Sequence, residues 1–349
     1  MHIFKNLTLR LLLIAVIGSL FIMSCNSKNK GSENKTEILL FIPGERNSGN
    51  IYDTLATGVE RAVEEAKKNN KPVSLTVVEA GLSQSLWLDK LTAVTAEEKY
   101  DLIISSNPSL PDLIKIVLEQ FPNQQFLVFD AFSNGMPQIT SFNYNQHEQA
   151  YVSGFISALV TTSKMKYAND KIKIGLIAGQ EYPVMNEIIL PAYIEGAKAV
   201  HPEIEVDFRI VGNWYDASKG YRLAQTMYAN GCDVIMPIAG GANQGVVSCA
   251  TDLGFYISWF DANGYNKAKG YVIGSSTIDQ DKLAFEQTLK FINGTMKKGL
   301  HTTLTMADGY VRFIEDDPVF ISTVPEDIRK LQSNMIKKIL SGELKLSVD

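Results

Sequence analysis

Two large aromatic side chains stand next to each other in one connection of this chain. Trp214 and Tyr215 follow a hydrophobic run that ends at Gly212, and Asn213 and Asp216 flank them. Such a pair can offer a flat surface for stacking, with directional hydrogen-bonding groups beside it, which is the chemistry of a ligand site. It can equally fold back over the edge of a hydrophobic core. The residues of this stretch alone leave both interpretations open.

Polar and aromatic residues recur after nearly every hydrophobic run. The stretches are PGERNSGNIYD, SSNPS, FDAFSNG, AGQEYPVMN, GNWYDASKG, AGGANQG and WFDANGY. Glycine permits tight turns and close backbone approach, while Asp and Asn supply acceptors and donors. Connections between strands and helices are often rich in these residues, so no single stretch decides the question. Taken together, the stretches favour a ligand cleft.

Signals for catalysis, metal binding and nucleic-acid binding are weak. No nucleophile elbow, phosphate-binding loop, metal-ligand spacing or dinucleotide-binding glycine pattern follows the first strand. We interpret His147 as a capping or hinge residue, and Cys232 and Cys249 as small core residues whose pairing is improbable. The net charge of -5, without a basic cluster, argues against nucleic acid as a partner.

The elements that must position these residues alternate regularly. From residue 37, short apolar runs alternate with amphipathic helical stretches, and the scheme restarts near residue 171. This pattern predicts two doubly wound α/β units, each a parallel sheet covered by helices. The remaining tail is too small for a third domain, so we expect it to complete both sheets and to join the lobes by several crossings. The carboxyl ends of the strands then face each other across a cleft.

The boundaries that follow define two lobes and an N-terminal extension. We expect lobe 1 to comprise residues 37–145 plus 270–302, and lobe 2 to comprise residues 146–269 plus 303–349. Opening and closing is expected about the segments YNQHE, at 144–148, and GYNKAKG, at 264–270.

The N-terminus has the pattern of a secretory leader with a lipid anchor. Lys5 and Arg10 flank the apolar run LLLIAVIGSLFIM, and IMSC then resembles a bacterial lipobox. This predicts a signal peptide over residues 1–24, lipidation at Cys25 and a polar tether over residues 25–36. The alternative is an ordinary leader that happens to contain a cysteine.

Five ordered blocks resemble a known family. The blocks FLVFDA, NQHEQAYVSGFISALVT, GLIAGQEYPVMN, GNWYDASKG and IAGGANQGV are similar in order and spacing to the basic membrane protein family of ABC-transporter substrate-binding lipoproteins. The resemblance implies a type I periplasmic-binding-protein fold with three crossings and a central cleft. It also implies a lipid-anchored, non-enzymatic monomer at the extracytoplasmic face of the cell membrane, which delivers a small molecule to an ABC permease and its ATPase.

The resemblance also implies roles for single residues. In the purine-nucleoside branch of the family, Asp130 matches the aspartate that holds the base, and Asp261 matches the one that holds the ribose. Trp214 falls on one stacking position and Tyr52 on the other, where Ile51 is the less suitable neighbour. The ribose-directed lysine of that branch is replaced here, because Ile278 stands at about its position.

These departures bear on the ligand. A larger platform suits a wider ring system, and the hydroxyls near Ile278 suit a neutral polyol chain. The pattern is closer to the riboflavin-binding branch of the same family, described for treponemes. The amide-bearing candidates for the polar edge of a flavin are Asn107, Asn186, Asn243 and Gln244, and Tyr215 is a candidate for the aromatic wall.

The sequence therefore predicts riboflavin as the transported ligand, with no resident cofactor. A purine nucleoside is the alternative within the family. A flavin or nucleoside hydrolase that uses Asp130 or Asp261 as a base is the alternative from another class. A ligand-sensing or adhesive surface lipoprotein without a transporter is a third.

Overall fold

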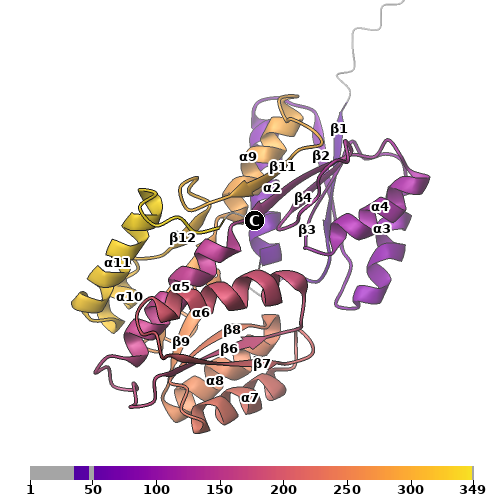
Figure 1. Ribbon diagram of the computed structural model, residues 1–349. Helices are drawn as coiled ribbons and strands as arrows, with labels where there is room; N and C mark the ends of the chain where they lie inside the picture. Colours follow the sequence, from indigo (N-terminus) through magenta and orange to yellow (C-terminus); the bar gives the residue numbers. More distant parts are fainter. Residues whose placement is uncertain (1–34, 47–50, 348–349) are drawn as a thin grey trace, which may run out of the picture.

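Two six-stranded sheets organise the computed structural model, which describes residues 35–46 and 51–347 (Figure 1). The predicted signal peptide, Cys25 and nearly all of the tether lie outside the described residues. Within the described part, no helix is both long enough and apolar enough to cross a membrane.

The first sheet is parallel throughout. Its strands are, in spatial order, β11 (His301–Leu304), β5 (Ile139–Tyr144), β4 (Phe126–Phe129), β3 (Leu102–Ser106), β1 (Thr36–Ile42) and β2 (Val73–Glu79). Alternate residues of β1 serve two cores: Leu39 and Phe41 join one hydrophobic cluster, and Leu40 joins the other. Strands buried on both faces read as continuous apolar runs, which is why these segments were recognisable in the sequence.

The second sheet repeats this strand order. Its strands are β12 (Val311–Phe313), β10 (Val272–Ile278), β9 (Tyr256–Asp261), β8 (Val234–Ile238), β6 (Lys173–Ala178) and β7 (Glu205–Ile210). Five of these strands are parallel, and β12 pairs antiparallel with β10. β4 in the first sheet and β9 in the second therefore occupy equivalent places. The predicted pair of doubly wound lobes is confirmed.

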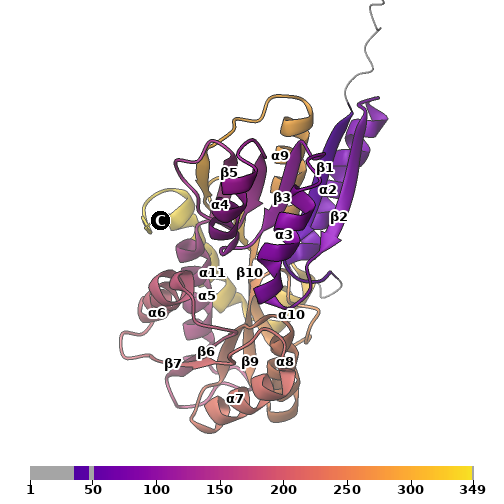
Figure 2. The same ribbon diagram turned by 90° about the vertical axis from the view of Figure 1, so that its right-hand side faces the viewer.

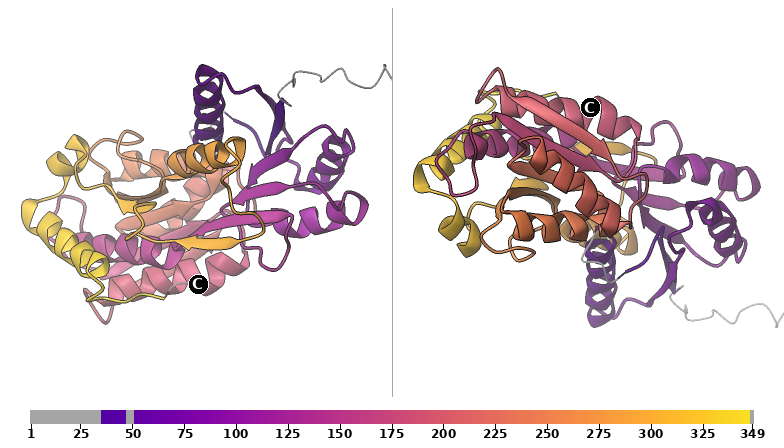
Figure 3. Two further views of the ribbon diagram at one scale, coloured as in Figure 1. Left: turned by 90° about the horizontal axis from the view of Figure 1, so that it is seen from above. Right: turned by 90° about the horizontal axis from the view of Figure 1, so that it is seen from below.

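Helices cover both faces of each sheet. The helices of the first lobe are α2 (Ile51–Lys68), α3 (Trp87–Thr95), α4 (Leu110–Gln120) and α9 (Gln280–Ile292). Figure 1 shows α3 and α4 on one side of the first sheet and α2 with α9 on the other. The helices of the second lobe are α5 (Gln146–Thr161), α6 (Leu190–Lys198), α7 (Ala217–Ala229), α8 (Asn243–Leu253), α10 (Pro318–Thr323) and α11 (Glu326–Leu340). Seen from above, the yellow C-terminal helices lie beside α5 and away from α3 and α4 (Figure 3).

The chain crosses between the lobes three times, as the resemblance implied. The crossings lie between β5 and α5, between β10 and α9, and between β11 and β12 (Figure 2). Asn145 occupies the first crossing and caps α5, because its Oδ1 accepts a hydrogen bond from the Glu148 N–H at 3.1 Å. The predicted crossing at residues 144–148 is therefore confirmed. The one predicted at 264–270 is wrong, since this segment joins β9 to β10 within the second sheet.

The expected lobe boundaries also need correction in the tail. Residues 270–302 were assigned to lobe 1, but β10 pairs with β9 and β12 in the second sheet, and only α9 packs with α2 in the first lobe. The segment 301–314 contributes a strand to each sheet. It forms β11 and β12 in different sheets, because Gly309 (φ 75°) and the Thr305–Asp308 hydrogen bonds turn the chain between them. A turn of this kind ends a strand locally, whatever the β-propensity around it.

The two remaining cysteines lie in the core. Cys232 and Cys249 are both buried and both free, which confirms their interpretation as core residues. Among the residues that the structure describes, no three His, Cys, Asp or Glu side chains are grouped so as to hold a metal ion.

Paired glycines let α5 and α6 approach closely. A Cβ on Gly154 would lie 2.0 Å from the carbonyl oxygen of Tyr193, and a Cβ on Gly196 would lie 2.1 Å from that of Tyr151. Backbone therefore packs directly on backbone where α5 leaves the first crossing. This contact anchors the crossing helix to the second lobe.

Gly154→Ala is expected to destabilise the protein by about 1–3 kcal/mol, because the added methyl group forces α5 and α6 apart. The direction of this stability change tests the close packing, because Gly→Ala within a helix otherwise stabilises a protein by about 1 kcal/mol. Urea denaturation followed by circular dichroism measures the change. Ser218→Ala, at an exposed position of α7, is the control and is expected to shift stability by less than about 0.5 kcal/mol. A stabilised Gly154→Ala protein would contradict the close packing.

Candidate ligand-binding site between the lobes

Two aspartates occupy equivalent places in the two lobes. Asp130 follows β4 and Asp261 ends β9, and each stands between a phenylalanine and an alanine in the sequence. Both adopt a left-handed backbone conformation, with φ of 48° and 70°. Non-glycine residues adopt this conformation at a cost and are enriched at functional sites. Each lobe thus presents an aspartate with a strained backbone at the C-terminal ends of its strands.

The surroundings of these carboxyl groups disfavour their charged forms. Burial raises the pKa of Asp130 well above its usual value, and the negative charge of Asp261 raises it further. Burial raises the pKa of Asp261 to about 6, although the amide of Gln149 acts in the opposite direction. Asp130 accepts a hydrogen bond from Gln146 Nε2 at 3.2 Å, and Asp261 accepts one from Gln149 Nε2 at 3.1 Å.

Trp214 lies at the strand ends of the second lobe. Its indole packs on Gly179, where a Cβ would come within 2.4 Å of Cε3, and Nε1 donates to Gln180 Oε1 at 3.2 Å. The ring centroid of Tyr182 lies 6.0 Å from that of Trp214, with the planes inclined by 50°. The indole remains 38% exposed, so it is not buried in the core of its lobe. The carbonyl of Trp214 fixes the loop by accepting from the Gly241 N–H at 2.7 Å.

Tyr182 connects this aromatic pair to the carboxyl groups. Burial raises the pKa of its phenol, and the charges of Asp261 and Asp130 raise it further. The phenol of Tyr182 therefore senses the charges of the aspartates of both lobes. Trp214, Tyr182 and the two aspartates are therefore our candidate group for ligand binding, which we call the interlobe site.

Tyr52 and Asn107 form the contribution of the first lobe. Asn107 Nδ2 donates to the hydroxyl of Tyr52 at 3.1 Å, while its Oδ1 accepts from the Ser109 N–H at 2.8 Å. Burial raises the pKa of Tyr52 to about 12, and the charge of Asp130 adds to the effect, so the phenol stays neutral at physiological pH. Tyr52 thus senses the charge of Asp130, and its stacking role stays a prediction.

Other predicted residues do not join this group. Asn243 Oδ1 accepts from the Ala239 N–H at 2.8 Å and thereby closes the turn after β8. Asn186 and Gln244 are exposed, and no hydrogen bond found in the described residues links either side chain to the aspartates. Tyr215 is 63% exposed, and Asp216 beside it caps α7 by accepting from the Lys219 N–H at 2.8 Å. A binding role for Asn186, Asn243, Gln244 and Tyr215 stays a prediction.

Sequence reasoning missed Gln146, Gln149, Gln180 and Tyr182. The first two stand three residues apart in NQHEQ, a spacing that puts them on one face of a helix. The other two lie in the strand-end stretch AGQEYPVMN, from which only Asn186 was selected. Their positions were visible in the sequence, but their partners come from distant segments.

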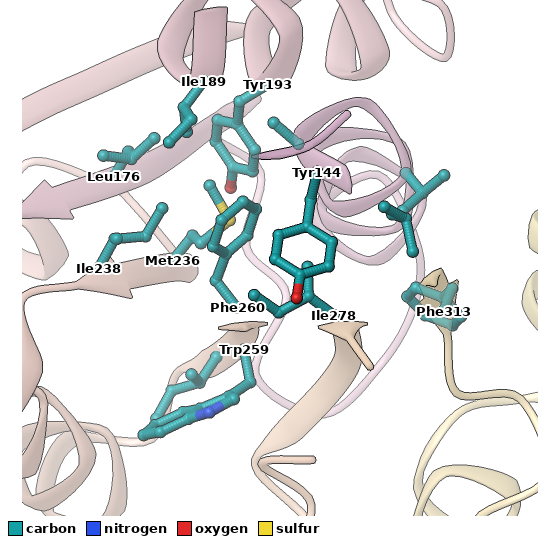
Figure 4. Close-up of a cluster of buried hydrophobic side chains, with 14 of the residues drawn as sticks. Tyr144, Leu176, Ile189, Tyr193, Met236, Ile238, Trp259, Phe260, Ile278 and Phe313 are labelled. Atoms are coloured by element: carbon teal, nitrogen blue, oxygen red, sulfur yellow. The ribbon is translucent and has the colours of Figure 1, made fainter. Parts of the chain in front are cut away.

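The position at which the nucleoside branch carries a lysine is apolar here. Ile278 ends β10, is 6% exposed and belongs to a buried hydrophobic cluster with Tyr144 and Phe260. In Figure 4 the hydroxyl of Tyr144 points toward Ile278. Within the described chain this hydroxyl has no hydrogen-bond partner. Burial raises the pKa of Tyr144, so the group is a neutral phenol beside an apolar wall.

Comparisons with known proteins identify relatives of this chain. The family described as ABC transporter substrate-binding protein PnrA-like matches residues 35–345. The ABC transporter nucleoside-binding protein BmpA of Lactococcus lactis is 31% identical over 53% of this chain and 48% of that protein, so the chain spans about half the length of this relative. Basic membrane protein A1 of Borrelia garinii is 23% identical over 96% of this chain and 95% of that protein.

Solved structures show the same fold. A solute-binding protein of an ABC transporter system from Aeropyrum pernix superposes with a TM-score of 0.78 at 19% identity, covering 90% of this chain and 94% of the other. The glucose-galactose binding protein GanP from Geobacillus stearothermophilus gives a TM-score of 0.59 at 13% identity, covering 81% and 99%. Both likenesses concern the type I periplasmic-binding-protein fold alone.

The match across 35–345 and the two-lobed fold confirm the predicted family and agree with the prediction that the protein is not an enzyme. The chain belongs to the PnrA-like family of ABC transporter substrate-binding proteins.

Proposed function

We propose that this protein is the lipid-anchored, extracytoplasmic binding component of an ABC importer, and that its ligand is a flat heteroaromatic compound bearing hydroxyl groups. Riboflavin is the first candidate. The single observation that supports the proposal is the pair of buried carboxyl groups, Asp130 and Asp261, at equivalent strand ends of the two lobes, both sensed by the phenol of Tyr182 beside Trp214.

Each part of the interlobe site suits one part of such a ligand. The half-exposed indole of Trp214 offers a stacking surface, and stacking of a base on an aromatic side chain is worth roughly 1–3 kcal/mol. Asp130 and Asp261 accept hydrogen bonds from ring N–H groups and from hydroxyls. Tyr52 supplies an aromatic face on the first lobe. Closure of the lobes about the three crossings would bring the two halves together around the ligand.

Two features favour riboflavin over a purine nucleoside. An indole is a larger platform than a phenyl ring, which suits a three-ring system, and Ile278 removes the cation that the nucleoside branch directs at ribose. The neutral phenol of Tyr144 beside Ile278 offers a hydrogen-bonding group without charge.

A purine nucleoside is the second candidate because of one specific observation. The Lactococcus relative carries the name of a nucleoside-binding protein, and it shares 31% identity over about half of this chain. The aspartate pair is compatible with either ligand, since both present N–H and hydroxyl donors.

Binding of riboflavin is expected to quench flavin fluorescence, and the freshly purified protein is expected to carry the absorbance of a bound flavin. Competition titrations with inosine, guanosine and adenosine measure the preference. Nucleosides that displace flavin at lower concentration would establish the second candidate. Neither class binding would contradict the proposed ligand.

Trp214→Ala is expected to weaken flavin binding about 5- to 150-fold, the equivalent of roughly 1–3 kcal/mol, because a stacking surface is lost. Isothermal titration calorimetry measures the affinity. Tyr221→Ala on α7 removes a tyrosine of the same lobe that hydrogen-bonds Asp252 instead, and serves as the matched control. Undiminished affinity of Trp214→Ala would remove Trp214 from the site.

Asp261→Asn is expected to stabilise the unliganded protein at pH 7.5 while weakening ligand binding. The pKa of Asp261 is raised to about 6, so ionisation costs stability as the pH rises from about 4 through 6. Two pKa units correspond to at most about 3 kcal/mol. Thermal unfolding from pH 4 to pH 8 should show a flatter profile for Asp261→Asn than for the wild type. Asp316→Asn, at an exposed position, is the control, and an unstabilised Asp261→Asn protein at pH 7.5 would contradict the burial argument.

A further inference from the structure

We propose that Gln146 and Gln149 are positioning residues, which hold the two ligand-binding carboxylates so that one helix, α5, couples the two halves of the interlobe site. The proposal rests on the proposed function. It adds two residues that act on the ligand through Asp130 and Asp261.

The contacts are symmetric in kind. Gln146 Nε2 donates to Asp130 Oδ1 at 3.2 Å, and Gln149 Nε2 donates to Asp261 Oδ1 at 3.1 Å. Gln149 Nε2 also reaches the carbonyl of Ser276 at 3.3 Å, on the strand that leads into the second crossing. Each aspartate is therefore held by an amide from the same helix, although the aspartates belong to different lobes.

The two glutamines stand close together on α5. Residues three apart on a helix lie on one face, about 5–6 Å apart at their Cβ atoms. Helix α5 moves with the second lobe, because it packs on α6 and β10. The Gln149 bond therefore lies within one lobe, while the Gln146 bond reaches across the first crossing to Asp130. In this structure, one turn of α5 therefore contacts the carboxylates of both lobes.

No other charged partner competes for this role among the groups that the structure describes. Burial and Asp261 act on Asp130, and burial and Gln149 act on Asp261. The other titratable groups that sense these charges are phenols, those of Tyr52, Tyr144 and Tyr182. Lysine and arginine make no contribution to either carboxyl group in the described chain. The amide of Gln149 is therefore the group that lowers the pKa of Asp261, while the amide of Gln146 is a hydrogen-bond donor to Asp130.

The remaining atoms of the glutamines support this assignment. The Oε1 atoms of both Gln146 and Gln149 are buried and have no donor within the described residues. A buried amide oxygen without a hydrogen-bond partner costs free energy, so the Oε1 atoms do not explain why glutamines are buried at these positions. The bonds that their amide nitrogens make to the carboxylates explain why glutamine stands at both positions.

The decisive variants are Gln149→Leu and Gln146→Leu, compared with Gln332→Leu. Gln332 is an ideal match, because it is buried, donates to the Val152 carbonyl of α5 at 3.0 Å and leaves its own Oε1 unpaired, yet touches neither aspartate. Carbon-detected NMR titration of aspartate carboxyl groups in the unliganded protein measures the pKa of Asp261 directly. Calorimetry with riboflavin, inosine and guanosine from pH 5 to pH 8 measures binding.

In Gln149→Leu the pKa of Asp261 is expected to rise by roughly one unit, and the pH at which binding falls off to rise with it. Gln146→Leu should weaken binding at least tenfold at pH 7 without moving the titration of Asp261. Gln332→Leu should change stability but neither readout. If the Asp261 titration and the pH profile of Gln149→Leu match those of Gln332→Leu, the positioning role is overturned.

The two readouts separate this proposal from the proposed function. A wild-type protein that binds none of the three probes contradicts the proposed ligand, while the NMR titration still decides whether Gln149 governs Asp261. A wild-type protein that binds a probe, with an unchanged Asp261 titration in Gln149→Leu, leaves the function standing and overturns the positioning role.

Discussion

The site depends on two carboxyl groups of like charge being kept partly buried at the junction of two lobes. Desolvation and mutual repulsion both oppose the ionisation of Asp130, and desolvation opposes that of Asp261. Such an arrangement lowers the stability of the empty protein at neutral pH, and a folded chain retains it only where function requires it. A ligand that places hydrogen-bond donors between the carboxylates relieves this cost. The relief contributes to the affinity and the specificity of binding.

The fold makes this arrangement reproducible. Equivalent strands, β4 and β9, end at the same edge of equivalent sheets, and each delivers an aspartate in a left-handed conformation. The tight glycine contact between α5 and α6 then fixes the helix from which Gln146 and Gln149 reach the carboxylates. A close packing contact some distance from the site thus contributes to the geometry of the site itself.

The walls of the site give it a different character from a cation-assisted ribose site. Ile278 and the unpaired hydroxyl of Tyr144 lie in a buried hydrophobic cluster without a cation, and the ring of Tyr182 lies 6.0 Å from that of Trp214. A neutral, flat and hydroxylated ligand fits these properties, because its polar atoms find acceptors at the carboxylates while its rings find the indole.

The sequence by itself determined the local features. The alternation of apolar runs and amphipathic stretches predicted both lobes, and the strand-end rule pointed to the stretches that contain Asp130, Asp261 and Trp214, because both patterns depend on neighbouring residues only. The family resemblance then singled out these three residues within their stretches. Only the tertiary structure decided that β10 belongs to the second sheet, that β11 and β12 separate, and that Asn243 closes its own turn. It alone joined Gln149 to Asp261 across 112 residues, and it decided that the phenol of Tyr182 senses the charges of both aspartates. Strand pairing and buried hydrogen bonds between distant segments are chosen by the packing of the whole chain, and no short stretch of residues encodes them.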